Sequence, residues 1–186
     1  MSRPAMAELK VFIAAAIACL ALLAGGRLGV RIEMRGLLWL FIAGLLIVLA
    51  IGDVETRRLP NPLVLALYAA AVAFAAGPAP TLWDLLRQAW PPAAAVGAGV
   101  LLITLAESAG RSVPIGMGDV KAAAALLPLI ADGATAYWMM MFAGLAAIGQ
   151  HYVTRHFLAG GTDRRVPFMP GLAIGLLLAL AWQPVS

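Results

Sequence analysis

The chain has 186 residues, of which 63% are hydrophobic and only 12% are charged. A soluble domain is about half apolar, so this composition excludes an ordinary soluble protein. It predicts an all-α, polytopic integral membrane protein, a bundle of about six or seven transmembrane helices. The 13 basic and 9 acidic residues leave a net charge of +4. Because the basic residues lie in short loops between apolar runs, they are expected to set topology and meet lipid headgroups rather than bind nucleic acid.

The apolar runs are the first feature along the chain, and a membrane span needs about 20 such residues. They cover residues 9–24, 37–52, 62–76, 91–106, 120–131, 134–153 and 167–182. The run 120–131 is short for a span, which is acceptable where a helix N-terminus lines a water-filled cavity. Before the fourth run, residues 81–90 predict a separate short amphipathic piece, with Trp83 and Trp90 suited to a membrane interface.

Local signals refine the ends and contacts of these spans. Asn61 followed by Pro62 predicts that the third span begins there, with Asn61 as its N-cap. Pro128 predicts a kink in the fifth span. Gly171 and Gly175, four positions apart in the last run, predict a close approach between helices.

The organisation that we expect is an N-terminal transmembrane helix and link in residues 1–36, followed by one membrane domain in residues 37–186. Cys19 is the one cysteine of the chain. An intrachain disulfide or a cysteine-based zinc site therefore cannot be built. His151 and His156 have no third ligand at a suitable spacing, so no metal site is expected.

The distribution of Lys and Arg predicts the orientation in the membrane. With seven spans, the two sides carry nine and four of these residues. The side with nine is expected to be cytoplasmic. It includes residues 1–10, 53–61, 107–121 and 154–166.

Two carboxyl groups fall on this predicted cytoplasmic side. Asp53 follows the second apolar run and Asp119 precedes the fifth, and ionisable residues at membrane depth are functional candidates. Two such groups can share one proton: the ionised one activates a water, and the protonated one hydrogen-bonds the scissile carbonyl and later protonates the leaving amine. Gly116 and Gly118 would let a peptide approach the backbone closely.

Simpler interpretations of the same residues stand beside this one. Asp53 alone could be a charge at a helix end, and Asp119 alone could be the N-cap of the fifth span. Lys121 could neutralise the carboxylates or extend to the interface. Glu55 is expected to be a solvated loop charge.

Three motifs carry a resemblance to a known family. They are Asp53 with the later Pro60 and Asn61, the segment Gly116–Lys121 (GMGDVK), and residues 166–171 (VPFMPG). In order, spacing and predicted side of the membrane, they resemble the prepilin peptidases, which are membrane aspartic proteases of the GxGD type. The resemblance covers about residues 37–183.

The resemblance implies a function and a site. Asp53 and Asp119 would be the catalytic pair, without metal or cofactor. The residues that would bind substrate or shape the site are Gly116, Gly118, Lys121, Pro60, Asn61, Pro167 and Pro170. The enzyme would lie in the inner membrane with its site facing the cytoplasm. It would cleave the leader of type IV or Flp-like prepilins after a glycine, so its partners would be prepilin-like proteins and membrane lipid.

The resemblance also has a limit and leaves rivals. Larger family members methylate the new N-terminus and carry a cytoplasmic domain with paired cysteines, so this sequence resembles the compact, peptidase-only form. A proton-coupled transporter could use the same carboxylates. A presenilin-like protease, which shares GxGD, and a non-catalytic assembly factor are further alternatives.

Overall fold

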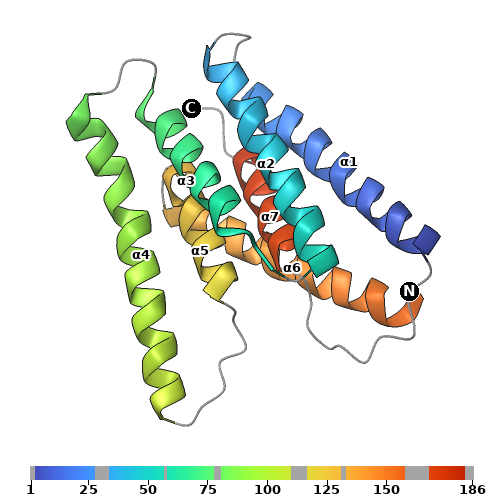
Figure 1. Ribbon diagram of the computed structural model, residues 1–186. Coiled ribbons are helices and arrows are strands. Elements are labelled where there is room, and N and C mark those ends of the chain that lie inside the picture. The colour runs from blue at the N-terminus through green and yellow to red at the C-terminus, as the bar shows by residue number, and fades with distance from the viewer. Residues whose placement is uncertain are drawn as a thin grey trace. The chain divides into compact units, whose positions relative to one another are not determined.

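The computed structural model describes residues 3–27, 34–56, 58–77, 81–109, 117–130, 133–157 and 168–182 (Figure 1). These residues form seven α-helices and one 3-10 turn, and no strand occurs among them. The elements are α1 (Arg3–Arg27), α2 (Met34–Thr56), α3 (Asn61–Ala76), α4 (Leu82–Ser108), α5 (Met117–Leu126), η1 (Leu127–Leu129), α6 (Gly133–Phe157) and α7 (Met169–Trp182). The predicted all-α fold is confirmed.

Several of these helices have the length and composition of membrane spans. Three described segments are long and apolar enough to cross a membrane: Ala7–Gly25, Arg35–Thr56 and Leu82–Ala106. Three shorter apolar helices are Asn61–Ala76, Thr135–Ala146 and Met169–Trp182. The fold is therefore that of a helical membrane protein.

The chain divides into two compact units, and each is described by itself. Unit 1 combines Met1–Arg58 with Asp132–Ser186, and unit 2 is Leu59–Ala131. The sequence-based division into residues 1–36 and 37–186 follows the extent of the family resemblance, whereas these units are defined by contacts within the structure. The sequence-based division therefore stays a prediction.

Helix α7 is the core of unit 1. It packs against α1, α2 and α6 (Figure 1). Leu172, Leu176 and Leu177 of α7 are completely buried, and so are Ile17 of α1 and Leu46 of α2. Because α7 is apolar on nearly every side, it can be buried all round by its neighbours, as a central helix must be.

Close helix contacts in unit 1 depend on glycine. A Cβ at Gly175 would lie 2.5 Å from the carbonyl oxygen of Met139 and 2.6 Å from the amide nitrogen of Ala143. The predicted close approach is thus confirmed at Gly175, where α7 meets the backbone of α6. On another side, the indole Nε1 of Trp39 donates a hydrogen bond to the carbonyl oxygen of Ala21 (2.9 Å), which ties α2 to α1.

In unit 2 the prediction of a separate amphipathic piece at residues 81–90 is wrong. Helix α4 is continuous from Leu82 through Pro91 and Pro92 to Ser108. It starts with a reciprocal cap. The backbone N–H and hydroxyl of Thr81 donate to Asp84 Oδ2 (3.0 and 2.6 Å), and the Asp84 N–H donates to Thr81 Oγ1 (3.2 Å). This strong start commits the chain to a helix ten residues before the prolines.

Two other local predictions also need correction. Pro60, not Asn61, occupies the N-cap position of α3, and its carbonyl oxygen accepts from the N–H groups of Leu63 and Val64 (3.1 and 3.2 Å). Pro128 does not kink a continuing helix. Instead α5 ends at Leu126 and the 3-10 turn η1 follows, because proline cannot supply the N–H that another α-helical turn needs.

Candidate active site

Asp53 lies in the last two turns of α2 and is buried, with 5% of its surface exposed. Its Oδ2 atom accepts a hydrogen bond of 2.9 Å from the backbone N–H of Met169, the first residue of α7. The positive end of the α7 dipole therefore faces the carboxylate, an arrangement that stabilises negative charge. A buried charge needs such a partner, so the contact explains how Asp53 is accommodated in unit 1.

The sequence at the start of α7 makes this N–H available. Pro170 occupies the second position of the helix, where its missing N–H costs nothing, and it is fully buried. The first turn is closed by the Leu172 N–H, which donates to the Phe168 carbonyl oxygen (3.0 Å). Pro167 lies outside the described residues, so its predicted role is not tested.

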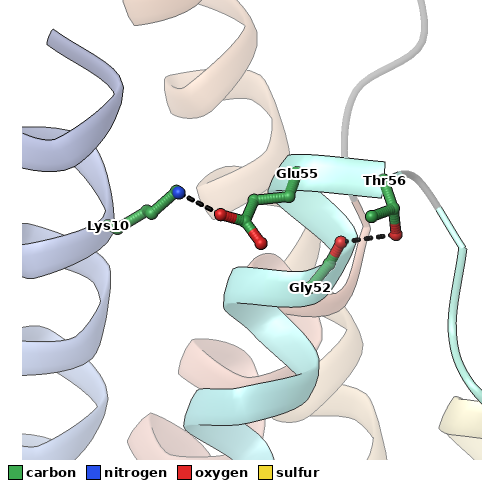
Figure 2. A network of polar contacts seen from close by, with 4 residues as sticks. All are labelled: Lys10, Gly52, Glu55 and Thr56. Atoms are coloured by element: carbon green, nitrogen blue, oxygen red, sulfur yellow. Dashed lines mark hydrogen bonds and ion pairs between the residues drawn. The ribbon is translucent and has the colours of Figure 1, made fainter. Parts of the chain in front are cut away.

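The end of α2 is held by polar contacts on either side of Asp53 (Figure 2). Thr56 Oγ1 donates to the carbonyl oxygen of Gly52 (2.9 Å). Glu55 is exposed, as expected of a solvated charge, but it lies in the last turn of α2 rather than in a loop and forms an ion pair with Lys10 of α1. The Thr56 contact closes the last turn of α2, and the ion pair links this end of α2, near Asp53, to α1.

Asp119 belongs to unit 2, in the first turn of α5. It is half-buried and is the third residue of the helix, so it is not the N-cap. A carboxylate in a first turn is stabilised by the helix dipole, as Asp53 is by another helix. Both candidate carboxyl groups thus have the same kind of electrostatic setting.

Packing within unit 2 does not require a glycine at position 118, beside Asp119. A Cβ at Gly118 would meet the side chain of Leu59 at 3.6 Å, an ordinary van der Waals distance. Packing in this unit therefore leaves room for an alanine at Gly118. Gly116 lies outside the described residues.

Unit 2 also joins two residues from separate sequence motifs. Lys121 Nζ donates to Asn61 Oδ1 (3.3 Å) across 60 positions of sequence. With Asn61 no longer the N-cap of α3, its side chain is available for this contact. Both residues line a cavity of about 470 Å³.

Comparison with protein families assigns the chain. Residues 40–185 match the type IV leader peptidase family. The chain belongs to this family. Comparisons with curated proteins and with solved structures found no match. The family and the apolar helices make the chain a membrane peptidase.

The structure brings together some predicted site residues and adds others. Asp53 meets the motif of the last span through Met169, and Asn61 meets Lys121. The Met169 N–H and the Lys10–Glu55 pair were not expected from the sequence. A backbone N–H is present at almost every residue, so the sequence does not indicate which one will donate to Asp53. The Lys10–Glu55 pair joins residues 45 positions apart and depends on how α1 and α2 pack.

Proposed function

We propose that the chain is an aspartic endopeptidase that removes the N-terminal leader of type IV or Flp-like prepilins. Asp53 and Asp119 are the catalytic pair, and cleavage follows a glycine at the cytoplasmic face of the inner membrane. The main support is the family match, which spans both aspartates and all three motifs. The buried, hydrogen-bonded carboxylate of Asp53 is the single structural observation that adds most to it.

The chemistry requires that the two carboxyl groups hold one proton between them. The ionised carboxylate removes a proton from a water, and the water oxygen attacks the scissile carbonyl carbon. The protonated carboxyl stabilises the developing oxyanion by a hydrogen bond. When the C–N bond breaks, the leaving amine takes a proton, so the pair returns to its starting state.

The remaining motif residues are proposed to shape the site. Gly118, which has space beside it in unit 2, leaves room for a peptide backbone near Asp119. Lys121 and Asn61 hold the start of α3 and the first turns of α5 together. Pro170 sets the start of α7 and hence the N–H that faces Asp53.

Co-expression with a candidate prepilin tests the proposal. Cleavage shortens the precursor, which is visible as a shift on a gel. The variants Asp53→Asn and Asp119→Asn should each leave the precursor uncut, because an amide neither accepts the proton of water nor supplies one to the amine. Precursor processing at the wild-type level in either variant would refute the catalytic pair.

A further inference from the structure

A cavity of about 470 Å³ lies within unit 2, between α3, α4 and α5. Its size is in the range of small-molecule sites. Its lining is mostly apolar: Asn61, Val64, Leu65, Tyr68, Ala93, Val96, Lys121, Ala124 and Ala125. The alanines of α4 and α5 leave the space that larger side chains would fill. Leu65 and Ala93 are exposed, so the cavity opens to the outside of the unit.

The cavity is polar at one end and has apolar walls along the rest of its length. Four lining residues of α3 follow helical spacing from Asn61 to Tyr68, which spans about 10 Å along the axis at 1.5 Å per residue. Asn61 is the first residue of α3, so the polar end coincides with the start of an apolar helix. Farther along, the Tyr68 hydroxyl donates to the carbonyl oxygen of Ala89 (2.8 Å) and bridges α3 to α4.

The polar end carries a positive charge. Asn61 is uncharged, so its contact with Lys121 does not neutralise the ammonium group. Asp119 is two positions earlier on α5 and is not among the lining residues. Residues two apart point to different sides of a helix, so Lys121 is the charged residue that faces the cavity and Asp119 does not.

We propose that this cavity binds an anionic phospholipid, with one acyl chain between α3 and α4 and the phosphate at Lys121. The charge at the end of the helix matches the headgroup, and the apolar walls along two turns of α3 match the chain. The exposed lining residues Leu65 and Ala93 give a lipid acyl chain a way into the cavity. The site does not depend on the catalytic role of Asp119.

Photo-crosslinking in vesicles tests the site directly. The full-length protein is placed in phosphatidylcholine vesicles that contain phosphatidylglycerol with a diazirine on one acyl chain, and adducts are mapped by mass spectrometry. Adducts should concentrate on the lining residues of α3 and α4. The same diazirine on phosphatidylcholine should label them less, and Lys121→Gln should reduce the phosphatidylglycerol yield by about fivefold, as expected for one cation at the headgroup.

Two neighbouring alanines supply a matched pair of variants. Ala93→Phe blocks the opening, whereas Ala94→Phe adds the same ring at an exposed position that does not line the cavity. Labelling of the lining residues should fall in Ala93→Phe and persist in Ala94→Phe. Equal labelling in both variants, or equal yields from the two lipids, would overturn the lipid site. So would loss of the label on addition of a prepilin leader peptide, which would assign the cavity to substrate.

The readout is independent of cleavage. Labelling is measured without substrate, and Asp119→Asn should show the wild-type adduct pattern. Failure of the proposed peptidase activity would therefore leave the lipid result intact. Unfolding temperatures of the two phenylalanine variants in detergent confirm that both remain folded.

Discussion

Asp53 combines a structural contact with its proposed chemical role. Its carboxylate accepts the Met169 N–H inside unit 1, so removing the side chain is expected to change packing as well as the proposed catalysis. The two roles can be separated because asparagine keeps an acceptor oxygen and loses the charge. Asp53 is thus a charged residue near a helix end, as the simpler interpretation expected, and it is also still a candidate catalytic residue.

Comparison of two substitutions at Asp53 separates these roles. Asp53→Ala leaves the Met169 N–H buried without this acceptor and should lower the free energy of unfolding by about 1–3 kcal/mol. Asp53→Asn should stay close to wild type in stability while losing cleavage. Thermal unfolding in detergent, paired with the cleavage assay, measures both. Equal unfolding temperatures for the two variants would contradict the structural role.

Substitution of alanine for glycine should have opposite effects on stability at Gly118 and Gly175. Gly118→Ala should keep or slightly raise stability, since a Cβ fits beside Leu59, but should slow cleavage if the glycine makes room for a peptide. Gly175→Ala would push against the α6 backbone and should cost about 1–3 kcal/mol. The measurements are the unfolding temperature and the cleavage rate of each variant. Full activity in a stable Gly118→Ala protein would remove the proposed function of that glycine.

At the scale of elements, α1 is attached to the part of the chain that carries Asp53. It precedes the residues that match the family, yet Lys10 pairs with Glu55 and the carbonyl oxygen of Ala21 accepts from Trp39. These contacts connect α1 to both ends of α2. We therefore expect α1 to support the position of Asp53 rather than to act as a detachable anchor.

Reversal of the Lys10–Glu55 charges tests this attachment. Lys10→Glu places like charges together and should destabilise the protein by up to about 1 kcal/mol, the usual range for a partly exposed pair. The double variant Lys10→Glu/Glu55→Lys should recover most of the loss. Glu8→Lys, an exposed change on the same helix, serves as the charge control. Thermal unfolding that shows no recovery in the double variant would exclude the pair as a link.

The errors in predicting elements have local causes. The apolar run that begins at residue 91 suggested a span separate from residues 81–90, but the cap formed by Thr81 and Asp84 begins one continuous helix earlier. At Asn61 the expected cap was displaced by one residue, since the carbonyl of Pro60 already accepts the first helical hydrogen bonds. Helix ends depend on competing signals a few residues apart, whereas the existence of each helix follows from a long apolar run.

At the scale of the whole molecule, composition and apolar runs were sufficient to predict an all-α membrane protein. The motifs were sufficient to predict the family. What the sequence could not supply were the long-range contacts, such as Asp53 with Met169, 116 positions apart, and Lys121 with Asn61. These depend on how helices pack, and no local pattern encodes the partner of a side chain.

The most direct test of the central claim is the rate of leader cleavage by purified protein for Asp53→Asn, Asp119→Asn and the double variant. If the two carboxyl groups act as one unit, each single change should slow cleavage by about 10²–10⁴-fold. The double variant should then be no slower than the slower single variant, because a pair that has lost one member is already inactive. A single variant with the wild-type rate, or losses that multiply in the double variant, would contradict the account.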